Sequence, residues 1–95
     1  MRAYKTLVKN ALSRDFTVSV WDGEEWQVKR SNKYQDIINA IESVDFSELR
    51  IRDKNGDYQG WASIVLDCED DEMVSDFTYN KIMHELTGFE WDGEE

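Results

Sequence analysis

The stretch LRIRDKNGDYQGWASIVL, residues 49–66, places two runs of strand-forming residues on either side of Asn55-Gly56. Asn-Gly flanked by such runs is the strongest short signal for a β-hairpin, so the two runs are predicted to pair as antiparallel strands. A two-residue turn predicts three cross-strand pairs: Asp53 with Tyr58, Arg50 with Trp61, and Leu49 with Ala62. This register gathers the apolar side chains on one face, which we expect to be the core face: Leu49, Ile51, Ala62, Ile64 and Leu66.

The other face of the hairpin carries charged, aromatic and apolar side chains: Arg50, Arg52, Trp61 and Val65. Trp61 opposite Arg50 predicts a cation–π contact, which contributes about 0.5–1 kcal/mol at an exposed site. An open sheet face with an exposed tryptophan is typical of an interface. Together with Trp21, these residues are therefore a candidate interface for a homodimeric scaffold or interaction module.

Residues 16–28 predict another hairpin, because apolar and polar side chains alternate on both sides of Asp22-Gly23-Glu24. The register that keeps the apolar side chains on one face pairs Val20 with Trp26 and Val18 with Val28. It leaves three residues for the loop and turns Trp21 away from the core face. The pentapeptide WDGEE, which contains this loop, occurs again as residues 91–95.

Three amphipathic helices are predicted from apolar residues at helical spacing, over residues 3–13, 32–44 and 74–87. Ser31 is a suitable N-cap for the second helix, and Gly88 is a suitable C′ residue for the third. The predicted order is α-β-β-α-β-β-α. It indicates an α+β fold with a four-stranded, mainly antiparallel sheet and helices packed on one face. Residues 1–88 are expected to form this single domain, and residues 89–95 an acidic tail.

Charge is distributed unevenly along the chain, which has a net charge of −10. Residues 1–54 hold ten basic and nine acidic side chains, a net of +1, whereas residues 55–95 hold Lys81 against twelve acids, a net of −11. Such a chain repels nucleic acid and anionic membranes from its acidic half and attracts basic proteins to it. We therefore expect a basic protein partner, with no direct nucleic-acid or membrane binding.

No residue pattern indicates an enzyme, a metal site or a cofactor. Cys68 and His84 are the only thiol and imidazole, and their spacing does not predict a nucleophile with its base. His84 falls beside the apolar stripe of its predicted helix and is expected to be solvated. Residues 53–57 resemble the start of an EF-hand loop, but Tyr58 and Ile64 stand where glycine and glutamate are required. A hairpin turn is the better interpretation, and we predict no catalytic activity.

Three features favour a cytoplasmic location. The chain has one cysteine, which suits a reducing compartment. No apolar run approaches the roughly 20 residues of a membrane-spanning helix. The first 16 residues contain polar residues throughout and lack the continuous apolar core of a secretory signal.

Acidic residues with neighbouring aromatics are the main candidate binding site: Asp67, Glu69, Asp70, Asp71, Glu72, Asp76, Glu90, Trp91, Asp92, Glu94 and Glu95, with Asp22, Glu24 and Glu25 as additions. In size, charge and mixed α/β pattern the chain resembles the small acidic DNA-mimic inhibitors encoded by bacteriophages, which act on restriction enzymes, CRISPR effectors and repair enzymes. The resemblance implies a non-enzymatic inhibitor that occupies the basic nucleic-acid site of a DNA- or RNA-processing protein in the host cytoplasm. An immunity protein against a nuclease toxin is the alternative, since it must cover a similar basic site.

Overall fold

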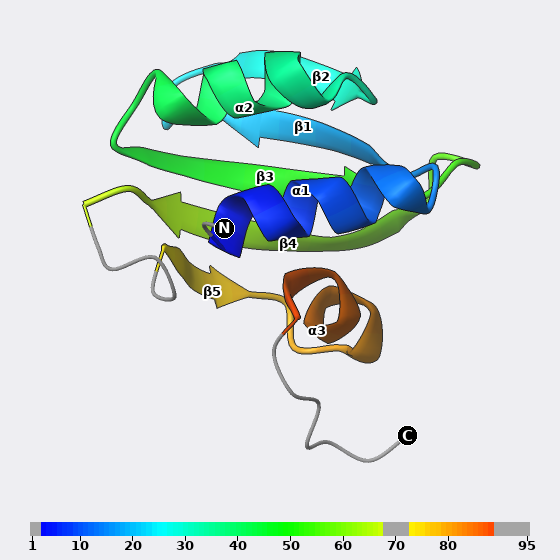
Figure 1. The fold of residues 1–95 in the computed structure, drawn as a ribbon. Coiled ribbons are helices and arrows are strands. Elements are labelled where there is room, and N and C mark those ends of the chain that lie inside the picture. The colour runs from blue at the N-terminus through cyan, green and yellow to red at the C-terminus, as the bar shows by residue number, and fades with distance from the viewer. Residues whose placement is uncertain (1–2, 68–72, 89–95) are drawn as a thin grey trace.

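The computed structural model describes residues 3–67 and 73–88 (Figure 1). Within these residues the fold is α+β, as predicted, with three helices and an antiparallel sheet. The elements in chain order are α1 (Ala3–Ser13), β1 (Thr17–Trp21), β2 (Trp26–Ser31), α2 (Tyr34–Glu42), β3 (Phe46–Arg52), β4 (Tyr58–Val65), β5 (Val74–Phe77) and α3 (Lys81–Thr87). The sheet has five strands rather than the predicted four. The tail, residues 89–95, lies outside the described residues.

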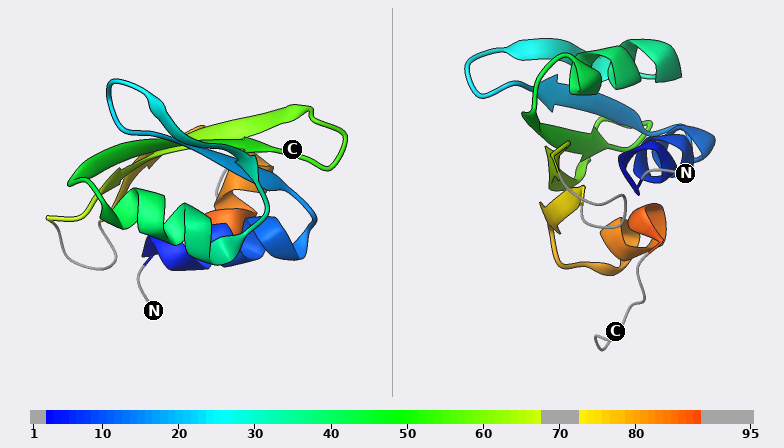
Figure 2. Two further views of the ribbon diagram at one scale, coloured as in Figure 1. Left: turned by 90° about the horizontal axis from the view of Figure 1, so that it is seen from above. Right: turned by 60° about the vertical axis from the view of Figure 1, so that its left-hand side comes forward.

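The strands lie in the order β2-β1-β3-β4-β5, so the strand β3 is central. Seen from above, all three helices lie on one side of the sheet, as predicted (Figure 2). The core fills the space between these two layers. Its largest fully buried side chains come from both: Tyr4, Leu7, Ile37 and Ile41 from the helices α1 and α2, Leu49, Ile51 and Ile64 from the sheet, and Met83 and Leu86 from α3. None of the described helices is both long enough and apolar enough to cross a bilayer.

The predicted helix over residues 74–87 is wrong in its first half. Val74–Phe77 is the edge strand β5, which pairs with β4, and the helix begins only at Lys81. Asn80 is its N-cap, with its side-chain oxygen accepting from Met83 N at 2.8 Å, and Gly88 ends it at φ 80°, as expected. Strand pairing overrides the helical spacing here, because β4 otherwise presents an unpaired edge.

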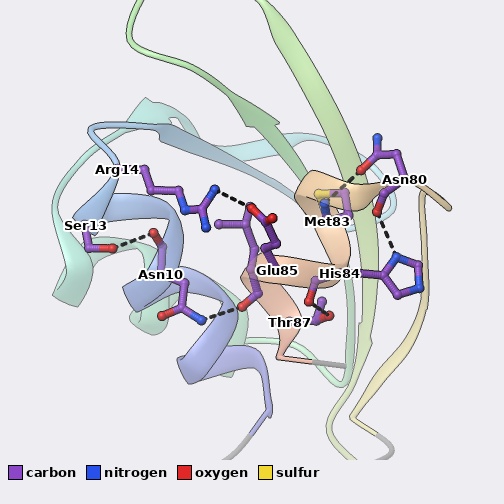
Figure 3. A network of polar contacts seen from close by, with 9 residues as sticks. Asn10, Ser13, Arg14, Asn80, Met83, His84, Glu85 and Thr87 are labelled. Atoms are coloured by element: carbon purple, nitrogen blue, oxygen red, sulfur yellow. Dashed lines mark hydrogen bonds and ion pairs between the residues drawn. The ribbon is translucent and has the colours of Figure 1, made fainter. Parts of the chain in front are cut away.

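The helix α3 is held against α1 by polar contacts at its exposed side (Figure 3). Asn10 Nδ2 donates to the carbonyl oxygen of Leu86 at 2.7 Å, and Arg14 Nη1 lies 2.9 Å from Glu85 Oε1. The helix α2 is shorter than predicted, and Ser31 does not cap it. Ser31 ends β2 instead, and Lys33 is the residue before the helix, without a side-chain cap.

The predicted register of the first hairpin is wrong. The structure pairs Trp21 with Trp26 and Val20 with Val28, and the loop has four residues, 22–25. Asp22 stabilises this longer loop, because its Oδ1 accepts from the backbone N–H groups of Glu24 and Glu25 at 2.8 Å each. Trp21 faces away from the core as predicted. Trp26 joins it there, and not on the core face as the predicted register required.

The second hairpin has the predicted Arg50–Trp61 and Leu49–Ala62 pairs, and its core face is the predicted one. The Asp53–Tyr58 pair is wrong, because Tyr58 pairs with Arg52 after a register shift. Asp53 and Asp57 close a three-residue loop, with Asp53 N donating to Asp57 O at 2.9 Å. Gly56 takes φ 89° at its end, a conformation that glycine adopts without strain.

Candidate functional site

The sheet face opposite the helices presents side chains in rows set by the cross-strand register. One row is Ser19, Arg50 and Trp61, the next is Thr17, Arg52 and Tyr58, and a third is Trp21, Glu48, Ser63 and Asp76. No described helix covers this face (Figure 2). Of these three rows, the first two each contain a cationic and an aromatic side chain, whereas the third contains no cation.

A depression of about 260 Å³ opens over these two rows. We call it the basic–aromatic depression, defined by the residues that line it: Ser19, Trp26, Lys29, Arg30, Arg50, Arg52 and Tyr58. Four of these seven side chains are cationic and none is acidic. A concave site with this lining favours an anionic ligand, since it contributes four cations and no carboxylate. The carboxylate of Glu48, outside the lining, lies 4.0 Å from Arg50.

Two of the cations come from one irregularity in the strand β2. Val18 pairs with Ser31 and Val20 with Val28, so both Lys29 and Arg30 stand opposite Ser19. This arrangement is a β-bulge, which re-aims side chains that regular alternation would send to opposite faces. Arg30 takes φ 47°, which is uncommon for a residue other than glycine, and its N–H donates to Ser19 Oγ at 2.8 Å. The bulge explains why both cations line the depression.

The two arginines of the strand β3 are oriented by weak contacts. Arg52 Nη1 donates to the Gly56 carbonyl at 3.0 Å, and its Cζ lies 5.9 Å from the centre of the Tyr58 ring. Arg50 Nη2 lies 4.0 Å from Glu48 Oε2, and both side chains are more than one-third exposed. Such a long, exposed ion pair contributes little, so the Arg50 guanidinium can exchange it for a ligand. Neither Lys29 nor Arg30 forms an ion pair with a carboxylate of residues 3–67 or 73–88.

Aromatic rings border the depression on both sides. Trp26 packs edge-on against Trp21 with ring centroids 5.1 Å apart, and Tyr58 is 49% exposed. The sequence predicts a cation–π contact between Arg50 and Trp61. The structure instead has one between Arg52 and Tyr58, in the neighbouring row. Val65 pairs with Phe46 at the far end of the face. Of the candidate interface residues, the structure thus brings Arg50 and Arg52 into the depression and leaves Val65 apart from it.

Asp22 anchors the hairpin tip beside the two tryptophans. The backbone N–H groups of Glu25 and Glu24, and then the Gln27 side-chain amide, donate to its carboxylate and lower the pKa of Asp22 below its usual value. Hydrogen bonds to the charged form therefore stabilise the loop at neutral pH.

We expect this hairpin tip to loosen only in acid. Because the folded-state pKa of Asp22 is lowered, its contribution is complete above the unfolded-state pKa and is lost as the pH falls through the folded-state value. A carboxyl ¹³C titration by NMR should give a pKa below the ordinary aspartate value. The Glu24 and Glu25 amides should lose protection against exchange, relative to their intrinsic rates, as the carboxyl protonates. Asp22→Asn should remove this pH dependence. A carboxyl that titrates at or above the ordinary value contradicts the loop geometry.

Most residues of the main candidate binding site lie outside the described residues: Glu69, Asp70, Asp71, Glu72, Glu90, Trp91, Asp92, Glu94 and Glu95. Asp67 and Asp76 are described, and both are exposed. Asp67 follows the strand β4, whereas Asp76 lies on β5 opposite Ser63. The described residues therefore place these two acids on the β4–β5 side of the sheet.

His84 is buried, at 7% exposed, so the prediction of a solvated histidine is wrong. The segment before α3 is extended, and it lays the rings of Phe77 and Tyr79 against the imidazole at centroid distances of 4.9 and 5.1 Å. The Nδ1 atom of His84 lies 2.8 Å from the Asn80 carbonyl oxygen. Within residues 3–67 and 73–88, no three histidine, cysteine or carboxylate side chains are grouped as a metal site would require. Cys68 lies outside these ranges.

The sequence patterns did not identify Ser19, Trp26, Lys29, Arg30 and Tyr58 as site residues. The available signal was the pair Lys29-Arg30 inside a strand, where strict alternation would bury one cation. Comparison of the chain with protein-family models, curated protein sequences and solved structures gives no match. Function is therefore inferred from the site alone.

Proposed function

We propose that the protein is a non-enzymatic binding protein that takes an anionic partner on its open sheet face. The observation that carries this proposal is the lining of the basic–aromatic depression by four cations and no carboxylate. Arginine forms short, charge-assisted hydrogen bonds to carboxylates and phosphates, often two at once. Exposed aromatic residues next to such cations are common binding hot spots.

The same charges disfavour a homodimer built on this face. A two-fold interface brings the same patch of both copies together, so it sets one cationic depression against another. Like charges in such an interface cost binding free energy unless an anion lies between them. A separate anionic partner avoids this repulsion, which is why we prefer it to the scaffold function.

The proposal is tested by an NMR titration of the ¹⁵N-labelled chain with three polyanions: polyphosphate, polyglutamate and a single-stranded oligothymidylate. We expect at least one of them to shift the backbone amides of Ser19, Arg50 and Trp61 more than those of the helix α1. Arg50→Gln with Arg52→Gln should abolish the shifts. Lys5→Gln with Arg14→Gln is the matched control, because it removes the same charge from the helix side. Equal shifts in both double variants, or no shifts with any polyanion, contradict the proposal.

A second function is favoured by the net charge of −11 in residues 55–95. It is the inhibitor of a nucleic-acid-processing protein, acting in the cytoplasm through the acidic residues that include Asp67 and Asp76. A negative surface attracts a basic cleft at long range and competes with nucleic acid for it. This binding would use the acidic half of the chain, including Asp76 in the third row of the open sheet face, and would not require the residues of the basic–aromatic depression.

The inhibitor function is tested by affinity capture from a host lysate with the unchanged chain and with Asp70→Asn, Asp71→Asn, Glu72→Gln. We expect a basic nucleic-acid-binding protein to be retained by the unchanged chain, released by moderate salt, and lost with the triple variant. Retention that is indifferent to the three substitutions would exclude these acids as the binding surface.

A further inference from the structure

We propose that the anionic partner of the open sheet face is single-stranded nucleic acid. Its phosphates would contact the cations of the basic–aromatic depression, and its bases would stack on Trp26 and Tyr58. This inference rests on the proposed binding function and narrows it to one ligand class. The cation spacing, the placement of the rings and their exposure support it.

The cations flank a path that fits one sugar–phosphate backbone. Arg50 and Arg52 project from the same face of β3 two residues apart, so their Cα atoms are separated by about 7 Å. This separation is comparable with that of neighbouring phosphates in an extended strand. Lys29 and Arg30 stand on β2, across β1 from the arginines, with their Cα atoms at roughly two interstrand spacings or 10 Å. The Arg30 guanidinium reaches across to Gly56 beside Arg52. A phosphate held between β2 and β3 would therefore contact cations from both of these β-strands.

The rings distinguish nucleic acid from an acidic peptide. Tyr58 on β4 and Trp26 on β2 lie at opposite sides of the depression, and each borders a cation. Carboxylates would contact the cations and leave both rings without a contact to the ligand, whereas every nucleotide brings a phosphate together with a flat base. Sheet-borne aromatics that stack bases, beside cations that follow the backbone, are how proteins bind single strands. In a duplex the base faces are already stacked, so the rings could not be used.

The net charge of −10 weakens this binding without preventing it. At about 0.1 M salt the screening length is roughly 10 Å, so an acid that lies further than this from the depression acts only weakly on a strand bound there. The contacts themselves should be sensitive to salt. Neutralising three or four phosphates of a single strand predicts a slope of about −2 to −3 for log K against log salt concentration.

The experiment is fluorescence anisotropy with the full chain and a labelled oligothymidylate of about 12 nucleotides, which lies within the usual range of single-strand site sizes. A duplex of equal length and a labelled polyglutamate peptide are the comparison probes. We expect the single strand to bind more tightly than either. Arg50→Gln with Arg52→Gln should weaken binding at least about tenfold and reduce the salt slope by about 1.

Aromatic variants test the stacking step. Tyr58→Ala and Trp26→Ala should each weaken the single strand about tenfold, the loss typical of one base–aromatic stack, and leave the salt slope unchanged. Phe46→Ala is the matched control, because this exposed aromatic residue lies on the same sheet face outside the depression. Tyr58 is half-exposed, so Tyr58→Ala should fold even if Trp26→Ala does not. Circular dichroism would show whether each variant is folded. Lys5→Gln with Arg14→Gln should keep the affinity of the unchanged chain.

The outcomes separate this inference from the function on which it rests. Polyglutamate binding that is lost with the arginine variant, without oligothymidylate binding, overturns the nucleic-acid assignment and leaves the anion-binding function intact. A duplex that binds as tightly as the single strand, or aromatic variants without effect, overturns the stacking arrangement. If neither oligothymidylate nor polyglutamate binds, the nucleic-acid assignment fails, and the anion-binding function fails with it unless polyphosphate binds.

Discussion

Leu49→Ala lowers the free energy of unfolding by about 2–5 kcal/mol, whereas Arg50→Ala at the next position lowers it by less than about 1 kcal/mol. Leu49 is fully buried and lies on the central strand, β3, where the surrounding side chains cannot collapse into the space it leaves. Arg50 points to the other face, where its contact to Glu48 is long and exposed. Urea denaturation of the two variants measures the difference directly.

The binding assay should give the opposite ranking for the same two variants. Leu49→Ala should keep polyanion affinity under conditions where it is folded, because no lining residue is changed. Arg50→Ala should lose affinity at nearly full stability. Equal losses of stability in the two variants would contradict the assignment of faces in β3, and with it the position of the site.

Gly60→Val should destabilise the protein by about 3 kcal/mol, at the upper end of the usual cost of overpacking a core. A Cβ atom at Gly60 would lie 2.5 Å from Met83 Cγ, 2.8 Å from Met83 Sδ and 3.3 Å from Thr78 Cβ. Met83 is fully buried in α3, so the helix or the strand must shift to make room. Gly60 thus sets how closely α3 approaches β4, and thermal or urea unfolding would detect its replacement.

A double variant tests the cause of this loss. Met83→Ala alone should cost about 2–5 kcal/mol because it leaves a cavity. In Gly60→Val with Met83→Ala, the valine side chain occupies part of that cavity, so the combined loss should be smaller than the sum of the single losses. Additive losses would show that steric overlap with Met83 is not the cause.

The spacing of apolar residues was sufficient to predict the two amphipathic strands of the central hairpin. The pairing of Arg50 with Trp61 and of Leu49 with Ala62 followed from alternation together with a glycine turn, and both pairs are present. The loop is one residue longer than the predicted two-residue turn. It consists of residues 54–56, and Gly56 takes the positive φ at the third and last loop position. The register shift between Ile51 and Arg52 compensates for the extra loop residue, which is why both pairs are kept.

The segment before α3 was misassigned for the opposite reason. Val74 and Phe77 are three residues apart, which is a helical spacing, but four residues are too few for periodicity to decide. The edge of β4 decides between helix and strand, because its backbone N–H and C=O groups pair with β5 and would stay unpaired beside a helix. Once β5 forms, the extended segment that follows it covers His84, whose burial the helical prediction could not include.

The sequence by itself determined the α+β class, the two faces of the central hairpin and the separation of charge between residues 1–54 and 55–95. These depend on residue types and on spacing within one element, which the chain carries without reference to its partners. Only the tertiary structure decided that β5 is a strand and that a bulge in β2 turns Lys29 and Arg30 toward Arg50 and Arg52. A bulge is defined by the strand opposite it, so four cations separated by some twenty residues of sequence share one depression only after β1, β2 and β3 have paired.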